Sequence, residues 1–191
     1  MRSTLFLLLA PLALASPIAL EARNTTKSCM ARSPGMTEWQ LEDFDFHASY
    51  VFSTPSHQNS WGYVSFTAVN PVHDTRTKCS AQSNRLNDFF YGDVEYACET
   101  DGDKNLGAAK FTFDRPSGDV TMEQTWYCHD QPDFPPARFT AKGDVKAQLR
   151  CEETKFENKN WTMGNVASQR DIKCEITDLV VPVKELTGIA R

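Results

Sequence analysis

Apolar and polar residues alternate along most of this chain. Between positions 39 and 52, apolar side chains at 44, 46, 48 and 50 are separated by polar ones, and Phe52 continues the same phase. This period of two predicts a strand with one buried face. Trp39 and Leu41 begin the same alternation, but Glu42 and Asp43 shift its phase, and this shift predicts a β-bulge.

Similar patterns recur at short intervals and predict strands over 61–69, 75–81, 89–98, 109–113, 120–126, 139–141, 145–149, 172–176 and 180–183. Residues 115–118 predict the turn of a hairpin, and the apolar phase changes around Gly143–Asp144. Residues 152–160 are polar and predict a surface loop. Since Ser83–Phe90 is the sole candidate for a helical turn, we predict an all-β fold, a single compact antiparallel β-barrel or sandwich.

The N-terminus has the features of a secretory signal peptide over residues 1–15. Arg2 is followed by an apolar run at 5–14 and by the small-residue site Ala13-Leu-Ala15. The run is about 10 residues, whereas a membrane span needs roughly 20. We expect residues 16–23 to be a short pro-segment that ends at Arg23. Its removal would leave one secreted domain at 24–191 in the extracellular space, without a membrane partner.

Charge narrows the choice of partners. Removal of residues 1–23 leaves 18 basic and 24 acidic side chains, a formal charge of −6. Such an acidic surface repels phosphate backbones and anionic lipid. We therefore expect no nucleic-acid partner, and the 168 remaining residues are enough for one domain with a real core.

Cysteine content predicts disulfides that staple this domain. Six cysteines lie beyond the signal segment: Cys29, Cys79, Cys98, Cys128, Cys151 and Cys174. An even number in an oxidising compartment predicts three bridges, although spacing alone leaves their pairing open. The alternative, zinc, lacks the close Cys or His spacing that such sites use, so we expect no metal and no cofactor.

Two sequons, Asn24-Thr-Thr and Asn160-Trp-Thr, predict a glycoprotein. Asn160 lies in the polar segment and is expected in a surface loop. Trp161 beside it is a candidate contact residue, because exposed tryptophans anchor protein partners or stack on sugars. The other interpretation is a loop residue that caps the barrel, and Trp39 and Trp126 fit the core instead.

The sequence lacks several common catalytic motifs. It has no G-x-S-x-G elbow, no glycine-rich phosphate loop and no zinc-protease helix motif. The four histidines (His47, His57, His73 and His129) are predicted as ordinary surface residues. A non-catalytic binding protein is therefore the main prediction. The alternatives are a barrel that binds a small apolar ligand or cell-wall carbohydrate, and a small secreted hydrolase or ribonuclease using Glu95, His129, Arg138 and Arg150.

Several short motifs are similar to one family of secreted fungal proteins. They are Trp39-x-Leu-x-x-Phe44, Lys78-Cys-Ser-Ala-Gln82 with Leu86-Asn-Asp88, Tyr96-Ala-Cys98, and Phe111-Thr-Phe-Asp114 with Ser117-Gly118. On these residues the chain resembles the Alternaria major-allergen-like proteins, which are compact β-barrels. The resemblance implies a virulence-related effector or elicitor at the plant surface, without established enzymatic activity. Its implied partner is a host extracellular protein, such as a thaumatin-like defence protein.

The resemblance also implies a disulfide pattern. It pairs Cys79 with Cys98 and Cys151 with Cys174. Cys29 lies where the family has a cysteine that can link two subunits, but Cys128 has no clear family counterpart. We therefore expect an internal Cys29–Cys128 bond and a monomer, with a Cys29-linked dimer as the alternative.

Overall fold

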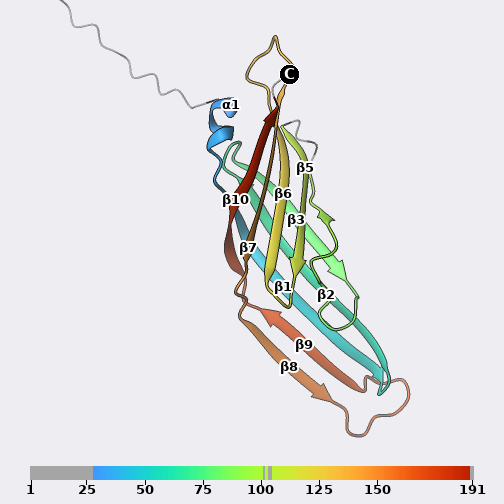
Figure 1. The fold of residues 1–191 in the computed structure, drawn as a ribbon. Helices are drawn as coiled ribbons and strands as arrows, with labels where there is room; N and C mark the ends of the chain where they lie inside the picture. Colours follow the sequence, from blue (N-terminus) through green and yellow to red (C-terminus); the bar gives the residue numbers. More distant parts are fainter. Residues whose placement is uncertain (1–27, 101, 103–104, 190–191) are drawn as a thin grey trace, which may run out of the picture.

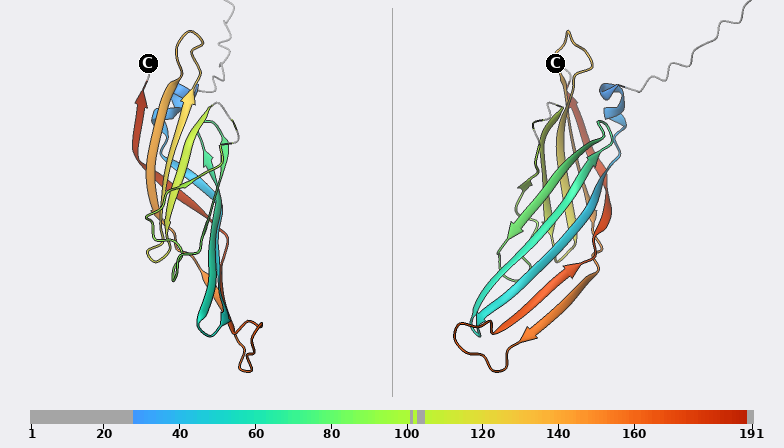
Figure 2. Two further views of the ribbon diagram at one scale, coloured as in Figure 1. Left: turned by 90° about the vertical axis from the view of Figure 1, so that its right-hand side faces the viewer. Right: turned by 180° about the vertical axis from the view of Figure 1, so that it is seen from behind.

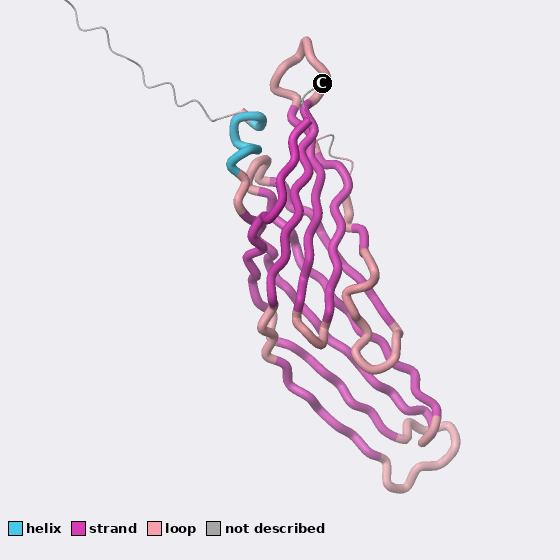
Figure 3. The backbone as a smooth tube through the Cα atoms, viewed as in Figure 1, coloured by secondary structure: helices cyan, strands magenta, loops and turns pink. Residues whose placement is uncertain are grey.

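The computed structural model describes residues 28–100, 102 and 105–189. The predicted signal peptide, the pro-segment and the Asn24 sequon lie outside this range. Strands make up most of the described chain, with one short helix at one end of the molecule (Figure 3). The predicted all-β antiparallel barrel, stapled by disulfides, is confirmed.

The strands follow a short helix, α1 (Cys29–Arg32), and a 3-10 turn, η1 (Ser33–Gly35). They are β1 (Glu38–Thr54), β2 (His57–Asn70), β3 (Thr75–Ser83), β4 (Tyr96–Ala97), β5 (Leu106–Asp114), β6 (Asp119–Cys128), β7 (Ala137–Lys146), β8 (Cys151–Glu157), β9 (Ser168–Cys174) and β10 (Thr177–Ile189). In the order β3-β2-β1-β10-β7-β6-β5-β4 they curl into a nearly closed barrel, while β9 joins β1 and β8 joins β9 (Figures 1 and 2). No helix in the described part of the chain is long and apolar enough to cross a membrane.

The predicted bulge in β1 is where this strand changes partners. The register shifts between Leu41 and Phe44, and Asp43 has a φ of 56°. Its backbone N–H donates to Asp178 Oδ1 at 3.0 Å. Before the bulge β1 pairs with β10, and from His47 onward it pairs with β9. The extra residue therefore allows the same edge of β1 to form hydrogen bonds with two strands, one after the other.

The barrel has one seam, between β3 and the end of β4. The Cys79–Cys98 disulfide crosses it with a Cα–Cα distance of 4.3 Å. Beside it the Glu99 N–H donates to the Lys78 carbonyl at 2.8 Å. A covalent bond and a backbone hydrogen bond thus join two strand segments that form no continuous ladder.

Aromatic rings fill the barrel interior. Phe44 stacks on Phe66 with ring centroids 5.5 Å apart, and Phe113 packs edge-on against Phe44 and Phe46. Trp39 and Trp126 are completely buried, as predicted. The alternation of apolar residues in β1, β2, β5 and β6 supplies these rings from opposite walls, so the core occupies the space a ligand barrel would leave open.

A buried glutamine connects the walls through polar contacts. Gln124 Oε1 accepts hydrogen bonds from Trp39 Nε1 at 2.9 Å and from Asn70 Nδ2 at 3.0 Å. Gln124 and Asn70 are buried with Trp39, so these contacts are made out of reach of bulk water. The network links β1, β2 and β6 across the interior.

Three of the secondary-structure predictions were wrong. The predicted strand over 89–98 is irregular apart from β4, because Phe89 and Phe90 are both buried although they are consecutive. The two strand segments predicted at 139–141 and 145–149 are not separate. Most of their residues lie in one strand, β7, which continues through Gly143. A Cβ at Gly143 would collide with the Pro182 carbonyl oxygen, so this glycine permits the close approach of β10.

The third error is the loop predicted over 152–160, most of which forms β8. All seven residues of β8 are exposed, so the strand has no apolar alternation to detect. Residues 83–90 contain turns but no helix, and α1, the one α-helix among the described residues, was not predicted. Its four residues are too few for a helical stripe.

Replacing Gln124 with leucine should destabilise the barrel by roughly 2–4 kcal/mol, since each buried donor left without an acceptor costs ~1–3 kcal/mol. The stranded donors are Trp39 Nε1 and Asn70 Nδ2. Chemical denaturation of Gln124→Leu against wild type measures the difference. Gln131→Leu, in an exposed loop, is the matched control and should stay within about 0.5 kcal/mol of wild type.

Candidate functional site

One end of the sheet runs past the barrel and forms a separate surface. Beyond the bulge, β1 and β2 are joined by β9 and β8 into a sheet ordered β2-β1-β9-β8 (Figures 1 and 2). We call this sheet, residues 46–52, 58–64, 151–157 and 168–174, the extension. It lies at the opposite end of the molecule from α1.

The outer face of the extension carries a cluster of aromatic side chains. His47 lies opposite Tyr63, and their rings stack at 5.1 Å with an interplanar angle of 22°. Trp61, two residues before Tyr63 on the same face, is 37% exposed. His47 is exposed, as its position on the polar side of the strand predicted. These side chains form an amphipathic patch on a rigid sheet.

Polar groups lie in the next strand beside this patch. Ser49, which pairs with Trp61 across β1 and β2, donates its hydroxyl to Asp171 Oδ1 at 2.6 Å. Gln169 Nε2 donates to Asp171 Oδ2 at 2.8 Å. The carboxylate is thus held in place by its neighbours, and the outer face combines fixed hydrogen-bonding groups with exposed aromatic rings.

β8 forms the outer strand of the extension and is held without burial of apolar residues. The Cys151–Cys174 disulfide ties its first residue to β9. Glu153 accepts hydrogen bonds from Arg170 Nη2 and Lys155 Nζ, both at 2.7 Å. The Arg170 contact, and then that of Lys155, lowers the pKa of the Glu153 carboxyl to about 2. Covalent and ionic contacts therefore replace the hydrophobic packing that fixes the other strands.

A polar hollow opens on the inner side, where the extension leaves the barrel. It measures about 270 Å³ and contains the side chains of Tyr50, Arg115 and Arg170. Arg115 Nη1 donates to Asp88 Oδ1 at 2.7 Å, and Arg170 lies 4.9 Å above the Tyr50 ring. Burial raises the pKa of the Tyr50 hydroxyl, which donates to the Asn87 carbonyl. Both guanidinium groups already have carboxylate partners, so the hollow is a closed ion-pair network.

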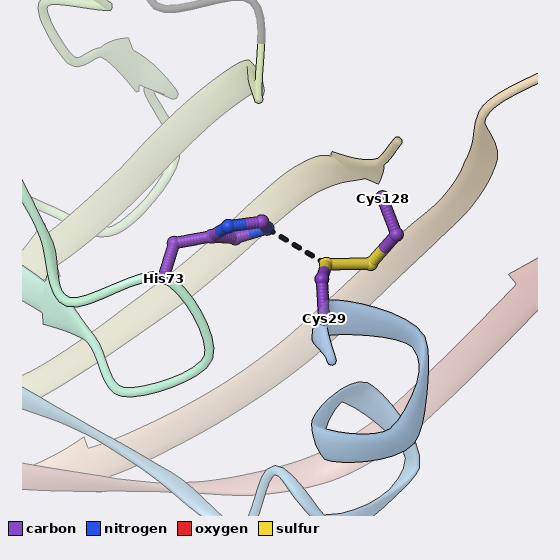
Figure 4. Close-up of side chains that lie close together, drawn as sticks. All are labelled: Cys29, His73 and Cys128. Atoms are coloured by element: carbon purple, nitrogen blue, oxygen red, sulfur yellow. Dashed lines mark hydrogen bonds between the residues drawn. A yellow bond between two sulfur atoms is a disulfide. The ribbon is translucent and has the colours of Figure 1, made fainter. Parts of the chain in front are cut away.

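The other end of the barrel is plugged by α1 and η1. Cys29 of α1 is bonded to Cys128 at the end of β6, and the Cys29 Sγ lies 3.1 Å from His73 Nε2 (Figure 4). Trp126 Nε1 donates to the Ser33 hydroxyl at 2.8 Å beneath this bridge. The three donor atoms of Cys29, His73 and Cys128 converge, but the two sulfurs are bonded to each other and are not thiolate ligands. The role of this cluster is structural, because its disulfide fastens α1 to the end of β6.

His73 was expected to be an ordinary surface residue, and the structure corrects this. It is half-buried beside Cys29 although 44 positions separate the two residues. No local spacing relates them, so a motif search had no signal to find. All six cysteines form internal bridges and none is free. Cys79–Cys98 and Cys151–Cys174 are the pairs that the resemblance implies, and Cys29–Cys128 is the bond expected because Cys128 has no clear family counterpart.

The predicted surface residues lie in the loop between β8 and β9. Asn160 is exposed there, and its glycosylation stays a prediction. Trp161 is half-buried, and its Nε1 donates to the Asn165 carbonyl at 2.8 Å. This indole folds back on its own loop, whereas Trp61, which sequence reasoning did not select, is the more exposed tryptophan.

The side chains considered for a ribonuclease do not converge. Glu95 binds Lys110, which lies opposite Glu123, while Arg138 lies opposite Tyr127, about 13 Å further along β6. His129 precedes β7 and Arg150 follows it. These two residues therefore lie near opposite ends of a ten-residue strand.

Comparison with known proteins gives one match. The family model described as Alternaria alternata allergen 1 matches residues 41–174, which is more than half of the chain. No curated protein and no solved structure matches. The matched range contains β2 to β9, most of β1, and so the whole extension.

The low pKa of Glu153 predicts a pH-dependent contribution to stability. Because the folded state favours the ionised carboxylate, the contribution is complete above about pH 4.5 and is lost as the pH falls towards 2. Glu153→Gln should therefore be less stable than wild type at neutral pH, and the difference should shrink between pH 4.5 and pH 2. Thermal unfolding across this range measures it, with Glu152→Gln on the opposite face of β8 as the control. A difference that is constant with pH would contradict the prediction.

Proposed function

Because this chain belongs to the Alternaria alternata allergen 1 family, we propose that it acts as an effector or elicitor by contacting a host plant protein in the apoplast. The family match and the disulfide-rich barrel fit a secreted protein without enzymatic activity. What a protein of this kind needs is a stable surface that a partner can recognise. The extension has the features of one.

The observation that supports the proposal is the aromatic patch of Trp61, Tyr63 and His47. Tryptophan and tyrosine are enriched among the residues that dominate binding energy, because they bury a large area with few rotatable bonds. Here the two strands that carry them are paired along almost their whole length, so the backbone beneath the patch is already fixed before binding. Ser49 and Asp171 add oriented hydrogen-bonding groups at the border of the patch.

Charge indicates the character of the partner. The chain has a formal charge of −5, and Asp171 lies beside the patch while Asp45 contacts His47 at 3.2 Å. An acidic protein associates faster with a basic partner, because long-range attraction steers their encounter. We therefore favour a basic extracellular protein of the host, such as a defence protein.

Replacing both Trp61 and Tyr63 with alanine should weaken capture of the host protein about tenfold or more, as expected for interface hot spots. The purified chain is immobilised, apoplastic fluid is passed over it, and the retained protein is identified and titrated. Phe134→Ala removes a 64% exposed aromatic side chain from the β6–β7 loop at the other end of the barrel and serves as the control. Leaf tissue infiltrated with each variant reports the defence response.

Three results would count against this function. Equal capture by wild type and the double variant would show that the aromatic patch is not the binding site. Absence of both a retained protein and a leaf response to the wild type would exclude the effector role. Retention on insoluble cell-wall polysaccharide, lost in the same double variant, would instead support the carbohydrate-binding alternative.

A further inference from the structure

Three atoms that can bind a soft metal ion meet where α1 is fastened to the barrel. Cys29 Sγ, Cys128 Sγ and His73 Nε2 all lie within 4.8 Å of one another. They come from α1, from the end of β6 and from the turn between β2 and β3, and Figure 4 shows the His73 ring directed at the disulfide. Because 44 positions separate Cys29 from His73, no spacing along the chain indicates this set. Two thiolates and an imidazole are ligands that zinc prefers, so the disulfide bond alone prevents these atoms from acting together.

We propose that reduction of the Cys29–Cys128 disulfide converts the cluster into a zinc site. Two molecules of a small thiol reduce the bond: each cysteine sulfur gains one electron and one proton, and the two small thiols leave joined as a disulfide. Zinc then displaces both protons and binds the two thiolates and His73 Nε2, which leaves a fourth position for water. In the oxidised protein the cluster keeps its structural role.

The distances require little rearrangement. In a tetrahedral site with Zn–S bonds of about 2.3 Å and a Zn–N bond of about 2.1 Å, the sulfurs lie about 3.8 Å apart and each lies about 3.6 Å from the nitrogen. The Cα atoms of Cys29 and Cys128 are 5.4 Å apart, and His73 Nε2 is 3.1 Å from Cys29 Sγ. Rotation of the two cysteine side chains therefore makes room for the ion while the backbone stays in place.

Other contacts hold the helix against β6 when the bridge is open. Trp126 Nε1 donates to the Ser33 hydroxyl at 2.8 Å, and both side chains are completely buried. The Met30 N–H donates to Asp130 Oδ2 at 2.6 Å, which joins α1 to the segment that follows β6. The two sulfurs therefore stay near each other after reduction.

The turn that carries His73 is fixed as well. Val72 is buried, and its N–H donates to Asn70 Oδ1 at 2.8 Å. On the other side of His73, Asp74 lies 3.9 Å from the Arg32 guanidinium at the end of α1. These contacts hold the imidazole beside the helix independently of the disulfide.

Burial and charge favour a bound divalent ion in the reduced state. Cys29 is 9% exposed and Cys128 is 2% exposed, so two thiolates without a counter-ion would be costly there. Two thiolates, a neutral imidazole and Zn²⁺ together carry no net charge. His73 is half-buried, so the cluster is open to an ion on that side. The inference does not rest on the proposed host interaction, because α1 and the extension lie at opposite ends of the molecule (Figure 1).

Zinc should make this one disulfide easier to reduce, because the ion binds only the reduced form. The purified chain is equilibrated in glutathione redox buffers at several fixed concentrations of free zinc. Free thiols are then alkylated, and peptide mass spectrometry gives the reduced fraction of each cysteine pair. Once zinc exceeds its dissociation constant, the ratio of reduced to oxidised Cys29–Cys128 should rise about tenfold for each tenfold increase in free zinc. The other two bridges are internal controls, and their ratios should not change.

Histidine variants test the third ligand while all six cysteines are kept. His73→Asn should reduce the effect of zinc about tenfold or more, because an amide is a poor ligand for this ion. His57→Asn changes an exposed histidine at the start of β2 and should leave the effect unchanged. Circular dichroism of each reduced protein shows that the barrel is folded.

Three results would overturn the proposal. A Cys29–Cys128 ratio that does not depend on zinc would show that the reduced cluster does not bind the ion. Equal zinc effects on all three bridges would show binding to thiols in general. An undiminished effect in His73→Asn would show that this histidine is not a ligand.

Discussion

The backbone of β1 forms hydrogen bonds with three strands, and the arrangement of the molecule follows from how they are shared. β2 pairs with almost the full length of β1, while β10 and then β9 occupy its other side in succession. Two antiparallel partners can follow each other there because the bulge at Asp43 inserts an extra residue between them. Before the bulge the sheet curls through β10 into the barrel, and after it the sheet continues through β9 as the extension. The division of the molecule into the barrel and the exposed extension is therefore set by one residue of β1, Asp43.

The disulfides act where hydrophobic packing is weakest. One ties the short α1 to the end of β6, one crosses the barrel seam, and one holds β8 against β9. Each of these places lacks a long strand pair with a buried face. Bridges of this kind commonly contribute about 2–4 kcal/mol. β8 shows the consequence most clearly, because Cys151–Cys174 and the contacts of Glu153 keep the strand ordered although none of its side chains is buried.

A structural feature can be predicted from the sequence when it depends on residues that are close together in the chain. The alternation in β1 and its phase shift at Asp43 predicted the strand and its bulge correctly, because both come from one face packing on a core. Gly143 was misinterpreted, since its role is to admit Pro182 from β10, which no nearby residue indicates. β8 was missed because exposure on both faces removes the alternation. His73 and Trp61 depend on which strands become neighbours, and this information lies in the tertiary fold.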